Sequence, residues 1–212
     1  WFMKKNKTYV GVMKIHKPIE EDKLRLEMDK FLGKIMQLPP VRSRVKREER
    51  ERSVYSWEIL EIDSIKNQVL FSCEVEAGTY IRKLISDLGL QIGGAHMLEL
   101  RRVKAGIFSE SDSNFINMYE LEKIKNNPEE LAKIIIPADE AIKKILPCIY
   151  VKKESEKTLL TGKPIFSGDL EGKDFFKLED KAEFAVFSDK FIGIYKKAID
   201  GEILARSLWV KN

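Results

Sequence analysis

The sequence predicts an α+β fold, with a mixed or antiparallel sheet followed by a small β-barrel domain. Three observations support this fold class. Apolar and polar residues alternate between residues 67 and 76, the pattern of a strand with one buried face. Residues 81–92 have apolar side chains at helical spacing, which indicates an amphipathic helix. Beyond Cys148, short apolar runs separated by Gly and Asp turns are typical of a small barrel.

The first elements can be assigned in order. Residues 8–17 are rich in β-branched side chains, so we expect a strand there. Residues 20–37 carry apolar side chains at spacings of four, three and four, so we expect one helix, which the proline pair at 39–40 ends. Residues 53–63 and 67–76 read as a pair of strands.

The later elements follow from the same patterns. In the helix at 81–92, Gly89 is expected to act as a C-terminal stop. A further strand is expected through residues 97–108. Asn117 followed by Glu120 is a capping pair that predicts a helix start.

The change of pattern near Cys148 predicts a domain boundary. A proline-bounded helix at 137–147 reads as the end of the first domain and its linker. We therefore expect two domains, residues 1–147 and residues 148–212.

Composition restricts the class of protein. The 212 residues are 43% hydrophobic, which is enough for a packed core. No apolar run approaches the roughly 20 residues that cross a bilayer, and no signal peptide is recognised. Two cysteines favour a reducing compartment, so the expected location is the cytoplasm, or the nucleus if the source has one.

Positive charge is concentrated at the start of the chain. Residues 1–52 contain 15 Lys or Arg and 8 Asp or Glu, whereas the whole chain has a net charge of only +4. This asymmetry indicates a basic surface for an anionic partner such as nucleic acid. A solvated lysine-rich surface explains the same charge.

Several kinds of chemistry have no support in the sequence. His16 and His96 lie far apart along the chain, and neither has a cysteine at metal-ligand spacing. Cys73 is on the apolar side of an expected strand, which favours a core position over a nucleophile. The glycines at 89–94 have neither the spacing nor the context of a dinucleotide loop.

The stretch "EAGTYIRKL" is the strongest candidate for a site. Gly78 allows a sharp reversal after a strand, and Tyr80 and Arg82 then emerge where a helix begins. An arginine there can hold a carboxylate through two parallel hydrogen bonds. A surface salt bridge is the alternative reading of Arg82.

Three stretches resemble one protein family: "KTYVGVMKIH" (7–16), "QLPPVRSRVKREERERSVYSWEILEI" (37–62) and the segment from "GTYIRKLISDLG" to "GGAHMLELRRVKAGIFSE" (78–110). They resemble RNA pseudouridine synthases of the tRNA pseudouridine synthase B and dyskerin branch, and are most similar to archaeal dyskerin homologues. The tail resembles a PUA domain, the small RNA-binding barrel of this family.

The resemblance implies roles for individual residues. Tyr9 matches the tyrosine that stacks on the flipped target base and takes part in proton removal. Arg82 matches the arginine that pairs with the catalytic aspartate, Tyr80 a tyrosine of the same pocket, and Leu100 the apolar residue beside the uracil. The expected RNA-binding residues are Arg42, Arg44, Lys46, Arg101 and Lys163.

The family's catalytic aspartate lies in a Gly-x-x-Asp-Pro type loop before the strand that matches residues 7–16, and nothing in this sequence matches that loop. We therefore expect the chain to be the C-terminal part of such an enzyme and to be inactive alone.

The resemblance implies guide-dependent isomerisation of uridine to pseudouridine in a box H/ACA ribonucleoprotein, without a metal or organic cofactor. The implied partners are guide RNA, an rRNA or tRNA substrate and small H/ACA proteins, with no membrane. The alternatives are a stand-alone enzyme acting on the tRNA T loop and a non-catalytic RNA-binding scaffold.

Overall fold

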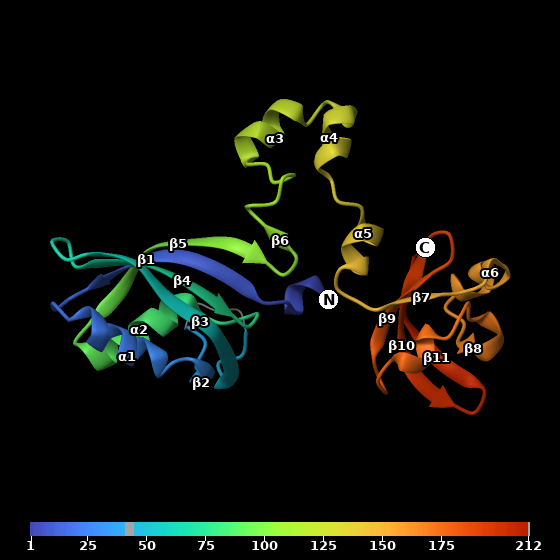
Figure 1. Ribbon diagram of the computed structural model, residues 1–212, viewed down its shortest axis with the longest axis horizontal. Coiled ribbons are helices and arrows are strands. Elements are labelled where there is room, and N and C mark those ends of the chain that lie inside the picture. Colours follow the sequence, from blue (N-terminus) through green and yellow to red (C-terminus); the bar gives the residue numbers. More distant parts are fainter. Residues whose placement is uncertain (41–44, 212) are drawn as a thin grey trace. The chain divides into compact units, whose positions relative to one another are not determined.

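The computed structural model describes residues 1–40 and 45–211. It divides into two compact units, Trp1–Pro128 and Glu129–Asn212 (Figure 1). The division falls earlier than the boundary expected near residue 147, because the helical segment after Pro128 groups with the second unit.

The first unit contains most of the expected elements. In chain order these are η1 (Phe2–Lys4), β1 (Lys7–Ile15), α1 (Glu21–Asp29), β2 (Gly33–Gln37), β3 (Arg50–Asp63), β4 (Gln68–Val75), α2 (Ile81–Ile92), β5 (Ala95–Ala105), β6 (Phe108–Ser109) and α3 (Met118–Ile124).

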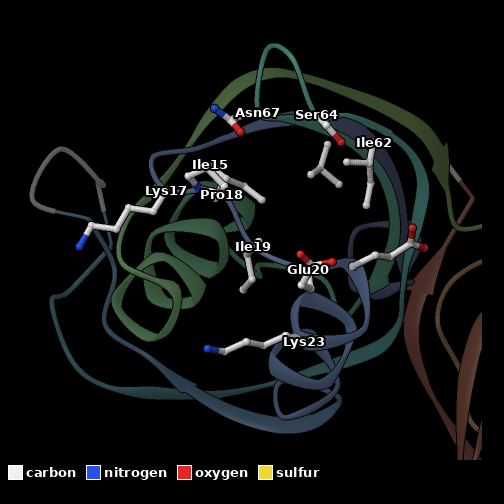
Figure 2. A pocket seen from close by; sticks show the side chains of 11 residues that line it. Ile15, Lys17, Pro18, Ile19, Glu20, Lys23, Ile62, Ser64 and Asn67 are labelled. Carbon is white, nitrogen blue, oxygen red and sulfur yellow. The ribbon is translucent and has the colours of Figure 1, made fainter.

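The strands of the first unit form one six-stranded sheet in the order β2-β3-β4-β1-β5-β6. Each strand pairs with its neighbours in antiparallel register. Helices α1 and α2 pack on one face, and Figure 2 shows the sheet curving around them. We call this face the helix face.

The core of the first unit explains why these segments form these elements. On β4, Val69, Phe71, Cys73 and Val75 are each at most 1% exposed, and they alternate with partly exposed residues, most of them polar. Helix α2 buries one side of its surface against them, with Leu84, Ile85 and Leu88 fully buried. Both segments therefore confirm the periodicity of the sequence.

The expected helix at 20–37 is wrong over its second half. Helix α1 ends at Asp29, and Gly33 has a φ of +85°, which is outside helical geometry. Residues 33–37 instead form β2, which pairs with β3. The pairing of residues 33–37 with β3 therefore decides their structure, although their apolar side chains continue the helical spacing of α1.

Helix α2 has the expected bounds but not the expected end. It continues through Gly89 to Ile92, and Gly93, with a φ of +85°, is its left-handed C-cap. Gly89 instead allows the backbone of α2 to approach the start of β5 closely. A Cβ at Gly89 would lie 2.5 Å from the backbone nitrogen of Ala95, so only glycine lets α2 lie this close to β5.

The remaining elements follow α3, which begins with the expected capping box of Asn117 and Glu120. They are α4 (Pro128–Ile134), α5 (Ala138–Lys143), β7 (Cys148–Tyr150), η2 (Lys153–Ser155), α6 (Glu156–Leu159), β8 (Ile165–Phe166), η3 (Ser167–Asp169), η4 (Asp174–Lys177), β9 (Glu183–Phe187), β10 (Phe191–Asp200) and β11 (Ile203–Val210).

The second unit is built on a five-stranded sheet in the order β7-β9-β10-β11-β8. β7 pairs with β9 in parallel, and the other pairs are antiparallel. A bridge between Val151 and Leu170 connects the segments that follow the two edge strands. The α+β class with antiparallel and mixed sheets is thus confirmed. None of the helices in the described ranges is long and apolar enough to cross a membrane.

Candidate functional site

The turn between β4 and α2 is the centre of the predicted site. Gly78 has a φ of +87°, which lets the chain reverse within five residues of the end of β4. Glu76 is held by Ser53 of β3 in two ways: its backbone N–H donates to the Ser53 carbonyl at 2.8 Å, and its carboxylate accepts from the Ser53 N–H at 3.0 Å. The turn is therefore fixed to the neighbouring strand.

Tyr80 and Arg82 follow this turn directly. Tyr80 is the N-cap of α2, and Arg82 is the second residue of the helix. Arg82 is exposed, and its side chain forms no ion pair or hydrogen bond with another residue in the described part of the chain. The alternative reading of Arg82, a salt bridge at the surface, therefore finds no support among those residues.

The electrostatics of this helix end favour an anion. The first turn of α2 contains no acidic residue, so the partial positive charge of the helix N-terminus and the Arg82 guanidinium are left uncompensated there. A carboxylate held at this position would interact favourably with both.

Tyr9 and Leu100 lie on the helix face. Tyr9, on β1, is opposite Cys73 of β4 and packs against the buried core. Leu100, on β5, is opposite Gly11 of β1. The Leu100 side chain lies 3.2 Å from where a Cβ of Gly11 would be. β4 ends two residues after Cys73 and leads into the turn before α2, so Tyr9 lies on the strand next to the one that leads to Tyr80 and Arg82. Their roles stay predictions.

The predicted RNA-binding residues are not gathered in the same way. Arg42 and Arg44 lie outside the described residues. Lys46 is exposed and ion-paired with Glu48. Arg101 is next to Leu100 along β5, so it points to the opposite face, where it pairs with Glu110 at 2.8 Å. Lys163 is exposed in the second unit, before β8.

Two basic residues near Tyr9, Lys7 and Arg102, are outside the predicted catalytic and RNA-binding sets. Arg102 is opposite Tyr9 in the β1–β5 register and shares the face of Leu100, a position that strand alternation from Leu100 indicates. Burial, and after it the positive charge of Arg102, lowers the pKa of the Lys7 amine. Two basic side chains therefore lie beside Tyr9 on β1 and β5.

The structure brings His16 and His96 together, although they lie 80 residues apart along the chain. The Nε2 of His16 is 2.7 Å from the Nδ1 of His96, because the ends of β1 and β5 are paired. In the described ranges, no group of three or more His, Cys, Asp or Glu side chains is arranged to hold a metal ion. Two imidazoles alone do not make a metal site.

Cys73 is a core residue, as expected. It is fully buried, and burial raises the pKa of its thiol to about 12. A thiol with such a pKa is not a nucleophile at neutral pH.

A large surface hollow lies elsewhere in the first unit. It has a volume of about 710 Å³ and is lined by the segment after β1 and by the turn between β3 and β4 (Figure 2). Ile15, at the far end of β1 from Tyr9, forms part of its wall. None of the predicted catalytic residues lines it, and Lys17, Lys23, Glu20 and Glu21 give it mixed charge.

Known proteins similar to this chain agree with the predicted family. A family model described as the tRNA pseudouridylate synthase B C-terminal domain matches residues 82–143. A probable tRNA pseudouridine synthase B of Pyrococcus abyssi is 43% identical over 162 residues, which cover 74% of this chain and 48% of that protein. That of Thermococcus onnurineus is 36% identical over 209 residues, or 95% of this chain and 62% of that protein.

Solved structures give the same result over nearly the whole chain. Cbf5 in a Cbf5-Nop10-Gar1 complex matches with a TM-score of 0.79 and 32% identity, covering 98% of this chain and 67% of that one. An H/ACA ribonucleoprotein bound to a substrate RNA containing 2'-deoxyuridine matches with a TM-score of 0.78 and 29% identity, covering 99% of this chain and 67% of that one.

The chain spans about half to two thirds of the length of these relatives. The two solved structures cover nearly all of this chain. The chain therefore belongs to the family of RNA pseudouridine synthases that includes archaeal tRNA pseudouridine synthase B and Cbf5, as its resemblance to dyskerin homologues predicted.

Proposed function

We propose that the full-length protein isomerises uridine to pseudouridine in RNA, as the guide-RNA-dependent catalytic subunit of a box H/ACA ribonucleoprotein. The observation that carries this proposal is Arg82. It stands uncompensated among the described residues at the start of α2, next to Tyr80 and on the helix that packs against the face of Tyr9 and Leu100. The similarity to Cbf5 supports the proposal.

The reaction breaks the bond between N1 of uracil and C1' of ribose, and forms a bond between C5 and C1' after the base has turned. The proton on C5 leaves, and N1 gains a proton, so substrate and product are isomers. Because the base must leave its stack to react, the site needs an aromatic platform and a dry wall.

Each predicted residue contributes one part of this chemistry. Tyr9 provides the aromatic platform and a hydroxyl for proton transfer from C5. Leu100 and Tyr80 exclude water from the base. Arg82 keeps a catalytic carboxylate ionised and oriented through paired, charge-assisted hydrogen bonds.

The carboxylate itself is the part that residues 1–212 do not provide in this proposal. No aspartate of this sequence stands in a loop like that of the family, and the described acids form no ion pair with Arg82. We therefore expect the polypeptide of residues 1–212 to bind RNA without isomerising it.

The partners follow from the same proposal. Guide RNA selects the uridine in rRNA or tRNA, and small proteins like the Nop10 and Gar1 of the similar complex dock on the catalytic domain. Residues 148–212 act as a PUA domain that holds the ACA end of the guide. The protein acts in the cytoplasm, or in the nucleolus if its source is eukaryotic.

A stand-alone enzyme for the tRNA T loop is the second candidate. The curated relatives are named as probable tRNA pseudouridine synthase B, which favours a tRNA substrate. Such an enzyme would need no guide RNA.

The test is release of tritium from RNA that carries [5-³H]uridine, because the reaction removes the hydrogen on C5. The full-length protein is assayed with substrate RNA with and without guide RNA, and with bare tRNA. We expect tritium release that requires guide RNA. Release from bare tRNA without guide would favour the stand-alone enzyme, and RNA binding without any release would favour the scaffold.

A further inference from the structure

Gln37 is a buried polar residue outside the predicted catalytic set. It is the last residue of β2 and only 2% exposed. Its side-chain oxygen accepts a hydrogen bond from the backbone N–H of Tyr80 at 3.0 Å, and its side-chain nitrogen donates to the Tyr80 carbonyl at 3.3 Å. Both ends of the amide thus contact the backbone of one residue, 43 positions further along the chain.

This contact fixes the residue at which α2 begins. Tyr80 is the N-cap of α2, but its side chain makes no capping hydrogen bond. The start of a helix is normally fixed by such a bond. Here the Gln37 amide fixes the N-cap residue from outside, so it determines where α2 begins and where Arg82, two residues later, is placed.

The same hairpin holds the rest of the turn. β2 and β3 are paired, with Gln37 opposite Arg50. From β3, Ser53 bonds the backbone of Glu76, and the Arg52 guanidinium lies 3.3 Å from where a Cβ of Gly78 would be. The turn is therefore held at its start, at Glu76, and at its end, at Tyr80, and Gln37 holds the end nearest the predicted catalytic side chains.

A buried amide that served only packing would be costly, because polar groups are stable inside a protein only when hydrogen-bonded. Thr79, one residue before Tyr80, provides a contrast. It is 9% exposed, and its hydroxyl has no hydrogen-bond partner in the described ranges. Of these two buried polar side chains, only Gln37 is hydrogen-bonded.

We propose that Gln37 is a positioning residue for the isomerisation: its amide fixes the Tyr80 backbone so that Tyr80 and Arg82 are presented to the target uridine. This inference rests on the proposed function. Gln37 acts through Tyr80 and not through RNA. Its loss therefore affects the chemical step and leaves RNA affinity in place.

The test uses Gln37→Met in the full-length protein assembled with guide and substrate RNA. Methionine keeps the length and volume of the side chain but cannot accept from or donate to Tyr80. We expect kcat for tritium release to fall roughly 10- to 100-fold with KM unchanged within about threefold, because small misplacements of catalytic groups act at this scale. Turnover is expressed per RNA-binding molecule, from a stoichiometric titration, so that unfolded protein does not count.

Amide hydrogen exchange provides a second measurement that does not depend on activity. Exchange at the Tyr80 amide should become faster in Gln37→Met, because the amide loses its acceptor. If Gln37→Met fails to fold, Gln37→Asn takes its place: asparagine has the same amide on a side chain shorter by one methylene, so the amide no longer reaches Tyr80. Gln37→Asn should also lower kcat and speed exchange at the Tyr80 amide. Thr79→Val is the matched control and should leave kcat and the Tyr80 exchange unchanged.

The outcomes separate the two proposals. An active wild-type protein whose folded Gln37 variants keep normal kcat would overturn the positioning role alone. An equal loss in Thr79→Val would also overturn it, since any change in the turn would then have the same effect. A full-length wild-type protein without tritium release would refute the proposed function and the positioning role with it.

Discussion

Replacing Arg82 with alanine in the full-length protein is expected to lower pseudouridine formation by about 10²- to 10⁴-fold. The reason is the loss of two charge-assisted hydrogen bonds, each of about 1.5–3 kcal/mol, to a carboxylate that must be ionised and oriented. RNA affinity should stay within about threefold, because Arg82 acts on the catalytic acid. Tritium release and filter binding measure the two quantities.

Two further variants define the role of Arg82. Arg82→Lys keeps the charge but loses the forked geometry, so we expect partial activity. Arg25→Ala is the matched control: Arg25 is an exposed helical arginine paired with Glu21, and such surface pairs contribute little. Turnover of Arg82→Ala at the level of Arg25→Ala would refute the proposed role.

Replacing Tyr9 with leucine is expected to stop product formation, with a loss of about 10³-fold or more. Leucine preserves packing against the core but removes the aromatic platform, worth about 1–3 kcal/mol per stacked base. It also removes the hydroxyl, and a general acid or base contributes roughly 10²- to 10⁴-fold. The measurement is pseudouridine yield in single turnover.

Tyr9→Phe separates these two contributions. It keeps the ring, so substrate binding should be normal while the rate falls. Because neither variant changes charge, the salt dependence of RNA binding should be unchanged. Tyr55→Leu, at an exposed tyrosine on β3, is the control. A wild-type yield from Tyr9→Leu would exclude Tyr9 from the site.

Local patterns in the sequence predicted much of the fold. The strand of residues 67–76 and the helix of residues 81–92 are specified by their own periodicity, and both are observed. The capping box at Asn117 and Glu120 is also a local signal. Residues 33–37 were predicted wrongly because their structure depends on pairing with β3, which no pattern within the segment reveals.

The candidate site was predicted in part for the same reason. Tyr80 and Arg82 stand out because the turn and the helix start lie in one short stretch. Gln37 could not be found, because its contact with Tyr80 spans 43 residues and involves backbone atoms. The pairing of His16 with His96 depends likewise on strand register across 80 residues.

The central claim is that Tyr9 contacts the uridine that is isomerised. The most direct test places 5-iodouridine at a target position already mapped by tritium release, in RNA assembled with the full-length protein. Light breaks the carbon–iodine bond, and the resulting radical couples to an aromatic side chain in contact with the base. Mass spectrometry should then find the crosslink on the peptide that contains Tyr9. Crosslinks confined to residues 148–212, or to the face of β5 that carries Arg101, would contradict the account.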